Sequence, residues 1–554
     1  MEFIEVKLPD GKKKVRKGAT LEEILAAGPG KEGPLVVAAR VNNILRELTT
    51  RIEEEAEIIP VDLRVQAGVR IYSRSLILVL ARATRELFPT SRLRIEHSLN
   101  KGLYGEIYLG RPFSEKDLRR IEERMREIIT ADEKIEKLSM PVEKARRLFA
   151  KDGQEDKVRL LEYAKTPEVQ IYRCGWFHDY FYDYMVPSTG YLHPFELRFH
   201  LPGFILRYPT IENPLALPVF VDQRKLGQVF YEHAMWGRSL GLPDVASLNK
   251  YIKDGKGPEL IRVNEALHEK NIVYLADQIT KDRGRIRLVL VAGPSSSGKT
   301  TFVQRLSVQL QVNGVRPVSI SLDDYFLNRD SAPRHPNGDP DFEAIENIDL
   351  ELFNEHLALL ILGEEIEIPR FNFLTGKREF RGEKLKISSD QPVIIEGIHG
   401  LNERLTQVVP KDRKFKVYVS ALTQLNLDDH NRIPTTDNRL IRRIVRDSQF
   451  RSHGAAATLR LWPGVRRGEE ENIFPYQEEA DAMFNSNLIY ELAVLKPYIE
   501  PLLAEVTPDC VEYSEAERLL RFLSYFLPLS GREVPKNSLL REFIGESCFY
   551  LDSE

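Results

Sequence analysis

Residues 286–301 read Ile-Arg-Leu-Val-Leu-Val-Ala-Gly-Pro-Ser-Ser-Ser-Gly-Lys-Thr-Thr. An apolar, β-branched segment leads into Gly-x-x-x-x-Gly-Lys-Thr, and a periodic segment that predicts a helix (301–311) follows. Strand, glycine loop and helix in this order are the context that a P-loop requires. The two glycines permit a tight backbone turn, and the loop amides with the helix N-terminus form a cradle for phosphates. A chance strand-to-helix turn is the alternative, and the Lys-Thr pair disfavours it. The stretch therefore predicts that the chain binds a nucleoside triphosphate.

Two residues of this loop carry chemistry of their own. Lys299 can reach the β- and γ-phosphates, and Thr300 offers the hydroxyl that ligates Mg²⁺ in such loops. We therefore expect ATP and Mg²⁺ as cofactors. The predicted ATP-binding residues are Gly293, Ser295, Ser296, Ser297, Gly298, Lys299, Thr300 and Thr301.

The composition limits the classes of protein. A chain of 554 residues is too long for one core, so three or four domains are expected. With 42% hydrophobic and 29% charged residues it is globular, and a net charge of −4 gives no bulk basicity for nucleic acid. No apolar run reaches transmembrane length, the N-terminus lacks a signal-peptide core, and the three cysteines are far apart. A cytoplasmic protein without a membrane partner is expected.

The pattern along the chain predicts five segments. The P-loop segment alternates strands (286–292, 317–322, 392–396, 415–420) with helices (300–311, 349–362, 437–449), which is typical of a parallel α/β sheet covered on both faces. The predicted fold class is thus multidomain, with α+β units before an α/β domain. Residues 1–64 form a small β-rich module, and residues 65–205 form an α+β unit with a helix at 73–88. Residues 206–284 are a proline-punctuated connector that ends in a helix at 264–279. Residues 285–510 form the P-loop domain, and residues 511–554 are a helical tail of unassigned role.

Carboxylates follow two strands of the predicted sheet. Asp323 and Asp324 follow the strand at 317–322, and Glu396 ends the strand at 392–396. Ligands of doubly wound sheets bind at the carboxyl ends of strands, so Asp323 and Glu396 are expected to face the triphosphate. One can ligate Mg²⁺ and the other can accept a proton from an attacking hydroxyl, so Thr300, Glu396 and Asp323 are the candidate metal ligands. Asp324 is interpreted as a solvated turn residue.

Four arginines lie on one predicted helical face. Residues 439, 442, 443 and 446 are spaced i, i+3, i+4 and i+7, with apolar residues between them. Guanidinium groups match phosphate geometry and can stabilise a transferring phosphoryl group. A solvated basic face is the other interpretation, and the sequence leaves both open. The hypothesis assigns catalytic roles to Arg443 and Arg446 and a substrate-binding role to Arg442.

The order and spacing of these motifs resemble those of uridine kinases and phosphoribulokinases. The resemblance covers about the last half of the chain and implies that Asp323 is the catalytic base, that Thr300 and Glu396 serve Mg²⁺, that Asp341 holds substrate hydroxyls and that the arginine helix carries a lid. The segments that carry it are the P-loop, Asp323-Asp-Tyr-Phe326, Asp339-Pro-Asp341-Phe342, Glu396-Gly-Ile, the helix at 439–447 and Ala480-Asp-Ala-Met483.

One stretch departs from that pattern. Uridine kinases have Tyr-Asp-Phe followed by a histidine that contacts the pyrimidine, and the matching residues here are 370–376. An aromatic ring remains at Phe371, which is predicted to bind substrate, but Gly376 occupies the place of the histidine. Recognition of a base is therefore open, whereas phosphoryl transfer does not depend on it.

The N-terminal half resembles another family. Residues 1–64 look like a TGS domain, and residues 65–205 resemble the editing domain of threonyl-tRNA synthetases through the segments 85–89, 110–117, 172–175 and 186–189. That editing site needs His-x-x-x-His and a downstream Cys-x-x-x-His. Here the first motif falls on Tyr72-Ser-Arg-Ser-Leu76, and Phe181 and Met185 align with the second. Apolar and aromatic side chains cannot bind a metal or activate water, so editing activity is expected to be absent.

The sequence as a whole predicts a kinase that transfers the ATP γ-phosphoryl group to a hydroxyl of a small polar acceptor, with the 5′-hydroxyl of a nucleoside as the leading candidate. One alternative is a kinase of the same family with a non-nucleoside acceptor. The other is a nucleotide-gated protein that binds RNA or tRNA, for which the basic run at 12–17 is a weak signal. Nucleic acid is the less favoured partner, and a homo-oligomer is left open.

Overall fold

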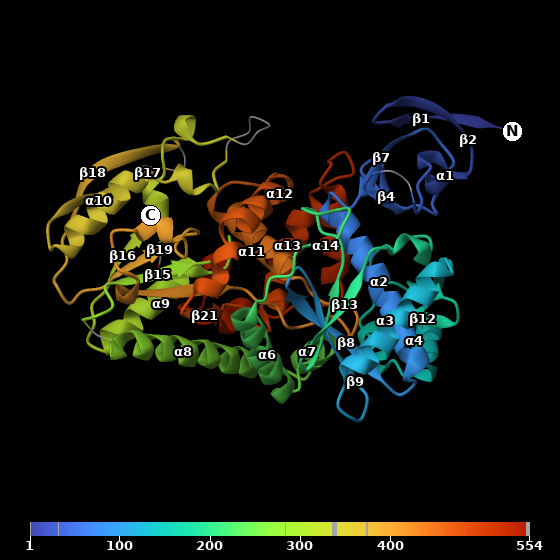
Figure 1. Ribbon diagram of the computed structural model, residues 1–554, viewed down its shortest axis with the longest axis horizontal. Coiled ribbons are helices and arrows are strands. Elements are labelled where there is room, and N and C mark those ends of the chain that lie inside the picture. Colours follow the sequence, from blue (N-terminus) through green and yellow to red (C-terminus); the bar gives the residue numbers. More distant parts are fainter. Residues whose placement is uncertain (1, 31–32, 283, 335–340, 373–374, 550–554) are drawn as a thin grey trace.

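The computed structural model describes residues 2–30, 33–282, 284–334, 341–372 and 375–549. In Figure 1 the N-terminal elements, coloured blue to cyan, lie on the right, and the P-loop sheet lies on the left. Residues 339–340 of the motif Asp339-Pro-Asp341-Phe342 lie outside the described residues, as do residues 373–374 of the stretch 370–376.

The first module is a five-stranded sheet with a short helix. β1 and β2 form a hairpin, and α1 starts at a capping box, in which Thr20 accepts a hydrogen bond from the Glu23 amide and the Glu23 carboxylate accepts one from the Thr20 amide. The strand order is β2-β1-β7-β4-β5. The elements are β1 (Phe3–Leu8), β2 (Gly11–Arg16), β3 (Ala19–Thr20), α1 (Leu21–Leu25), β4 (Val36–Val41), β5 (Ile44–Glu47), β6 (Arg51–Ile52) and β7 (Ala56–Asp62).

The second unit places helices against two antiparallel sheets, β13-β14-β9-β8 and β10-β11-β12. Its first helix, α2, begins at Gln66, so the predicted start at 73 was wrong. Gly68 reads as a helix breaker, yet a Cβ there would lie 2.0 Å from the Asp62 carbonyl oxygen, so close packing requires glycine. The elements are α2 (Gln66–Leu87), β8 (Arg92–Leu99), β9 (Gly102–Tyr108), α3 (Glu115–Thr130), β10 (Ile135–Pro141), α4 (Val142–Lys151), α5 (Glu155–Leu161), β11 (Glu168–Cys174), β12 (Phe177–Asp179), β13 (Glu196–His200) and β14 (Gly203–Arg207).

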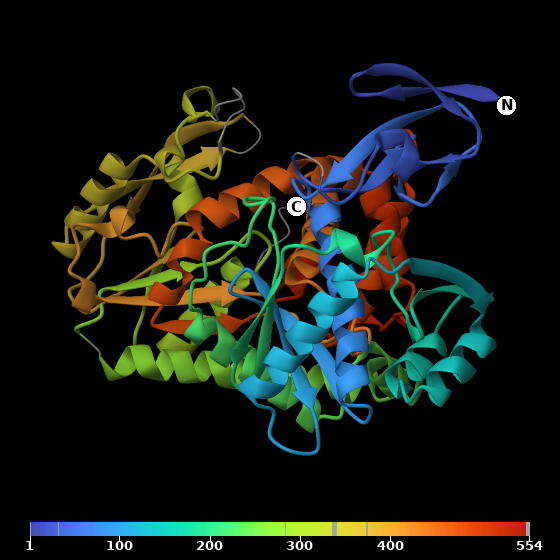
Figure 2. The same cartoon turned by 45° about the vertical axis from the view of Figure 1, so that its right-hand side comes forward.

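The segment 206–284 contains three helices, α6 (Arg224–Ser239), α7 (Val245–Lys253) and α8 (Gly257–Lys281). α8 starts seven residues before the predicted helix, with Pro258 in its first turn, where a missing N–H does no harm. Both views show α8 running beneath the P-loop sheet (Figures 1 and 2). Arg305 of α9 pairs with Glu265 and Glu269 of α8, so this helix is packed onto the P-loop domain.

The P-loop domain contains a five-stranded parallel sheet in the order β16-β19-β15-β20-β21. One apolar cluster joins it to α8 and α9 and another joins it to α10 on the opposite side, which confirms the α/β class. The hairpin β17–β18 was not predicted. The elements are β15 (Leu288–Ala292), α9 (Lys299–Val312), β16 (Val318–Ser321), α10 (Leu350–Ile361), β17 (Ile366–Asn372), β18 (Lys377–Leu385), β19 (Val393–Glu396), β20 (Lys414–Ser420), α11 (Thr435–Phe450), α12 (Ala455–Asn472), β21 (Ala482–Asn485) and α13 (Glu491–Ala504).

The tail connects the two halves. Its helices are α14 (Tyr513–Leu523) and α15 (Arg541–Ile544). The Ser514 hydroxyl accepts a hydrogen bond from the Leu45 amide of β5, and Glu515 pairs with Arg70 of α2. The tail also contributes to an apolar core that contains residues of both halves, including Phe149 and Ile444. The two halves therefore share one packed interior.

Candidate active site

The backbone of the P-loop requires its two glycines. A Cβ on Gly293 would lie 1.9 Å from the Val419 carbonyl oxygen of β20, and Gly298 has φ +82°, in the left-handed region. A Cβ on Gly298 would also approach Leu539 of the tail to 2.8 Å. The close packing of β20 and the tail therefore fixes the shape of the loop.

The loop offers donors that suit a triphosphate. The hydroxyls of Ser296 and Ser297 are buried and have no hydrogen-bond partner in the described part of the chain. Buried hydroxyls ordinarily have a partner, so these two atoms fit an anionic ligand in the loop. Lys299 folds back over the loop and donates from Nζ to the Pro294 carbonyl at 3.2 Å.

Thr300 and Glu396 form an oxygen pair that suits Mg²⁺. Thr300 Oγ1 donates to Glu396 Oε1 at 3.0 Å. Two adjacent ligands of an octahedral Mg²⁺, each about 2.1 Å from the ion, lie about 3 Å apart. Burial raises the pKa of Glu396 to about 7, with Lys299 opposing and Asp323 adding to the shift. A cation between these groups would offset the cost of the buried charge.

Asp323 lies beside this pair, because β16 is the parallel neighbour of β19 and Ser321 is in register with Glu396. Burial raises the pKa of the Asp323 carboxyl, and the nearby charges of Lys299 and Arg451 oppose that shift. A carboxylate with a raised pKa, close to a lysine, is suited to accept a proton at neutral pH.

The arginine face of this helix is largely covered, with Arg439 and Arg442 at most 1% exposed and Arg443 and Arg446 14% exposed, so the interpretation of a solvated basic face was wrong. Arg439 donates to the Ser295 carbonyl at 3.0 Å and pairs with Glu469, while Arg443 donates to the Ser295 hydroxyl at 2.9 Å. Arg446 pairs with its neighbour Asp447. This helix therefore holds the P-loop from one side.

The substrate-binding role predicted for Arg442 does not fit its position. Its side chain is fully buried and pairs with Glu491 at 2.6 Å. It also donates to the Ser486 carbonyl at 2.8 Å. A guanidinium group with these partners positions the loop and the helix α13 and does not face an acceptor.

Asp324 is also not the solvated turn residue that was expected. Its side chain pairs with Arg370 at 2.9 Å and accepts the Phe371 amide at 3.3 Å. The strand β17 is thereby tied to the strand end that carries Asp323. The Phe371 ring packs edge-on against Phe326, with centroids 5.7 Å apart.

Gly376 could not be replaced by a side chain without rearrangement. It has φ +67°, and a Cβ would lie 2.4 Å from Cδ of Arg329. The place of the pyrimidine-contacting histidine is thus closed by a neighbouring arginine. Asp341 accepts the Glu343 amide at 3.1 Å within its own loop.

Three carboxylates near the P-loop were not predicted. Glu469 of α12 accepts the Ser295 amide at 3.1 Å, and Glu542 of the tail accepts the Thr301 hydroxyl at 2.8 Å. Burial raises the pKa of Glu343 to about 7, and Glu469 adds to that shift. Glu343 lies two residues beyond Asp341, which was a weak signal, whereas the other two come from segments without a recognised motif.

The N-terminal half has apolar packing where editing domains have their site. Leu76, Phe181 and Met185 are at most 2% exposed and belong to the main core of that half. Tyr72 is also buried and donates its hydroxyl to the Pro194 carbonyl at 2.9 Å. Buried apolar and aromatic side chains therefore occupy the positions for which the resemblance calls for metal ligands.

The described part of the chain contains neither a metal-binding cluster of protein side chains nor a helix suited to span a membrane. In residues 2–30, 33–282, 284–334, 341–372 and 375–549, no group of three His, Cys, Asp or Glu side chains could hold a metal. This does not exclude the magnesium pair above, because Mg²⁺ usually takes one or two carboxylates and fills its shell with phosphate oxygens and water. Over the same ranges, no helix has both the length and the apolarity to cross a membrane.

A P-loop at the carboxyl edge of a parallel sheet, with a lysine, a hydroxyl and carboxylates converging on it, defines a P-loop kinase domain. Residues 288–490 match the profile of the Phosphoribulokinase / Uridine kinase family, so the C-terminal half carries a domain of that family.

The N-terminal region is similar to threonine–tRNA ligases. The ligase of Pelobacter propionicus is 28% identical over 198 residues, which cover 36% of this chain and 31% of that protein. The ligase of Rubrobacter xylanophilus is 34% identical over 194 residues, with 35% and 30% covered. This chain thus spans about a third of the length of these curated relatives.

Solved structures show weaker likenesses. A possible uridine kinase from Bacillus stearothermophilus is 21% identical, with a TM-score of 0.27 over 39% of this chain and 98% of that one. A D-glycerate 3-kinase from Cryptococcus neoformans is 17% identical, with a TM-score of 0.19 over 43% and 78%. Scores this low carry no weight for function.

Proposed function

We propose that this chain is an ATP-dependent kinase that transfers the γ-phosphoryl group to a hydroxyl of a small polar acceptor, with the 5′-hydroxyl of a nucleoside as the leading candidate. The observation that carries the proposal is the convergence of Lys299, the Thr300–Glu396 oxygen pair and Asp323 at the ends of adjacent strands. A cytoplasmic setting agrees with such an acceptor.

The residues divide the reaction among them. Asp323 accepts the proton of the acceptor hydroxyl while the acceptor oxygen forms its bond to the γ-phosphorus and the bond from that phosphorus to the ADP oxygen breaks. Lys299 neutralises phosphate charge, and Arg443 and Arg446 are the candidates for stabilising the transferring group. Thr300 and Glu396 would hold Mg²⁺, which supplies further charge neutralisation when bound.

The acceptor side would be formed by Asp341 and Phe371. A carboxylate can hold sugar hydroxyls, and an aromatic ring can pack on a base or another planar group. Because Arg329 closes the position of Gly376, base recognition would depend on Phe371 and not on a histidine.

The test is an ADP-release assay with Mg-ATP against nucleosides, pentose phosphates, pantothenate and simple polyols. Stimulation by one nucleoside, lost in Lys299→Ala, would support the full proposal. Stimulation by a non-nucleoside alone would keep the kinase and replace the acceptor. If ATP binds but no acceptor stimulates turnover, the proposal is wrong, and binding of tRNA with and without ATP becomes the next assay.

A further inference from the structure

A cleft of about 510 Å³ lies where the second N-terminal unit meets the helices α6 and α7. Its walls include Arg92 and Arg94 of β8, Tyr108 of β9, Arg159 of α5 and Arg238 of α6. None of its lining residues is an acid, and none belongs to the P-loop. Its volume is within the range of small-ligand sites, about 300–1,000 Å³.

The acidic partners of these arginines lie behind them. Arg92 pairs with Asp429 at 2.6 Å, and Arg159 pairs with Asp244 at 2.8 Å. The two arginine side chains are 53% and 43% exposed, whereas the two carboxylates are 10% and 5% exposed. The carboxylates thus fix the guanidinium groups from the protein side, and the cationic side faces the cleft.

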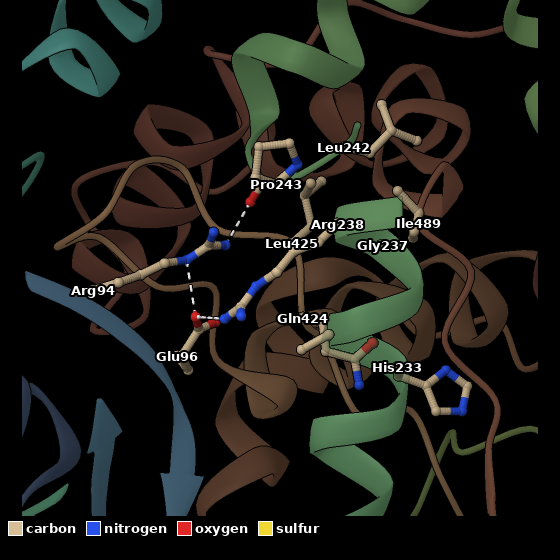
Figure 3. A pocket seen from close by; sticks show the side chains of 11 residues that line it. Arg94, Glu96, His233, Gly237, Arg238, Leu242, Pro243, Gln424, Leu425 and Ile489 are labelled. Atoms are coloured by element: carbon tan, nitrogen blue, oxygen red, sulfur yellow. Dashed lines mark hydrogen bonds and ion pairs between the residues drawn. The ribbon is translucent and has the colours of Figure 1, made fainter. Parts of the chain in front are cut away.

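The floor of the cleft is organised in the same way. Figure 3 shows Arg94 and Arg238 converging on Glu96, at 3.1 and 2.6 Å, around an adjoining cavity of about 10 Å³. Arg94 also donates to the Pro243 carbonyl at 2.8 Å. This cavity has room for about one water molecule, so a ligand would occupy the larger cleft beside it.

Several donors of these arginines remain available. Over the described residues, Nη1 of Arg92 and both Nε and Nη1 of Arg159 and Arg238 make no hydrogen bond to the protein. Pre-positioned guanidinium donors match the oxygens of a phosphate, often in pairs. Tyr108 is 42% exposed beside them, and Arg238 lies over one face of its ring, 6.0 Å from the centroid, which leaves the opposite face for a ligand.

We propose that this cleft binds a small phosphorylated ligand, and that a nucleotide is the class that uses both the arginines and the tyrosine ring. The phosphate would lie against Arg92, Arg159 and Arg238, and a planar base would pack on Tyr108. The site is distinct from the P-loop and does not depend on the proposed kinase activity.

Binding is measured calorimetrically in a Lys299→Ala background, which weakens phosphate binding at the P-loop. The probes are inorganic phosphate, AMP and a short single-stranded RNA. Saturable binding of about one equivalent of AMP is expected, and it should be weakened by roughly tenfold or more in Arg92→Gln/Arg159→Gln, because charged hydrogen bonds to the phosphate are lost. Tyr108→Ala should weaken the binding of AMP and leave the binding of inorganic phosphate unchanged.

The matched control is Arg119→Ala, an arginine of α3 that is 72% exposed and paired with Glu115. It should bind like the background protein. Equal binding in the cleft variant and this control would overturn the proposal, as would the absence of saturable binding by phosphate and AMP. If the RNA binds but phosphate and AMP do not, the proposal of a small ligand is wrong and RNA is the ligand class of the cleft. If the double variant shows no thermal unfolding transition and is therefore not folded, AMP binding by the single variant Arg159→Gln is compared with that of the background protein instead.

Discussion

The two halves of the molecule differ at the positions where each resembles the functional site of a known family. The N-terminal half has buried apolar side chains there, and the C-terminal half has ionisable ones. In the N-terminal half, Phe181 and Met185 are 2% exposed and packed into the core where the resemblance calls for a cysteine and a histidine. In the C-terminal half, Lys299, Asp323 and Glu396 place ionisable groups around the P-loop despite the cost of burying them, and this burial raises the pKa of both carboxyl groups. Apolar side chains at such a site add to the core, whereas buried ionisable groups cost stability, which is a cost expected at functional sites.

The largest effect is expected for Lys299→Ala. Loss of its charge beside the phosphates should reduce ADP release by on the order of 10²–10³-fold or more, because a preorganised charge in such a site supplies much of the rate. The control is Lys253→Ala, an exposed lysine of α7. If Lys299→Ala turned over at the wild-type rate, the P-loop would have no part in catalysis. The two halves would then not differ in whether their family-like sites function.

The N-terminal counterpart is a change in stability and not in rate. Phe181→Ala should lower the free energy of unfolding by about 3–5 kcal/mol, since it leaves a cavity in a packed core. Urea denaturation measures this loss, and Trp176→Ala, where the side chain is 54% exposed, should cost far less. Equal costs for the two variants would mean that Phe181 is not part of a well-packed core.

Asp323→Asn tests the base directly. It should leave ATP binding nearly intact and lower kcat by on the order of 10²-fold or more, as loss of a general base does. Asp324→Asn is the control, because Asp324 ties down β17 and should affect the acceptor KM more than kcat. A collapse of ATP affinity with kcat retained in Asp323→Asn would make Asp323 a metal ligand.

The sequence predicted what local patterns determine. The strand before Gly293, the helix after Gly298 and the carboxylates at strand ends follow from periodicity and from the α/β rule that ligands meet strand ends. The structure places those elements as expected, and it brings Thr300 and Glu396 within hydrogen-bonding distance although 96 residues separate them.

The remaining features of the site could not be predicted, because they depend on which residues pack against each other in the folded protein. The spacing of the four arginines gave one helical face, but only the packed structure shows that Arg442 is buried against Glu491. The contact of Glu542 with Thr301 joins residues 241 apart in sequence, and no local signal specifies it. Helix starts failed for a similar reason, because Gly68 is required by a neighbouring carbonyl and not by the helix itself.

The smallest predicted effect concerns the interface between the halves. His430, in the loop before α11, hydrogen-bonds through Nδ1 to Asp179 of β12 at 2.6 Å, and both are buried. Burial alone would lower the pKa of His430, but the adjacent Asp179 outweighs it and the pKa is raised, with Lys157 opposing and Asp156 adding to the effect. The charged form is therefore favoured in the folded protein.

A raised folded-state pKa gives stability that is fully present below the unfolded value, about 6.5, and is lost as the pH rises through the folded pKa. The difference in unfolding free energy between wild type and His430→Gln should therefore shrink as the pH increases from 6 to 9. The decrease is about 1.4 kcal/mol for each unit by which folding raises the pKa of His430. Urea denaturation at several pH values measures it, with His453→Gln, a substitution of an exposed histidine, as the control. A difference independent of pH would mean that His430 joins the two halves by packing alone, and the interface would then resemble the apolar N-terminal core more than the charged P-loop site.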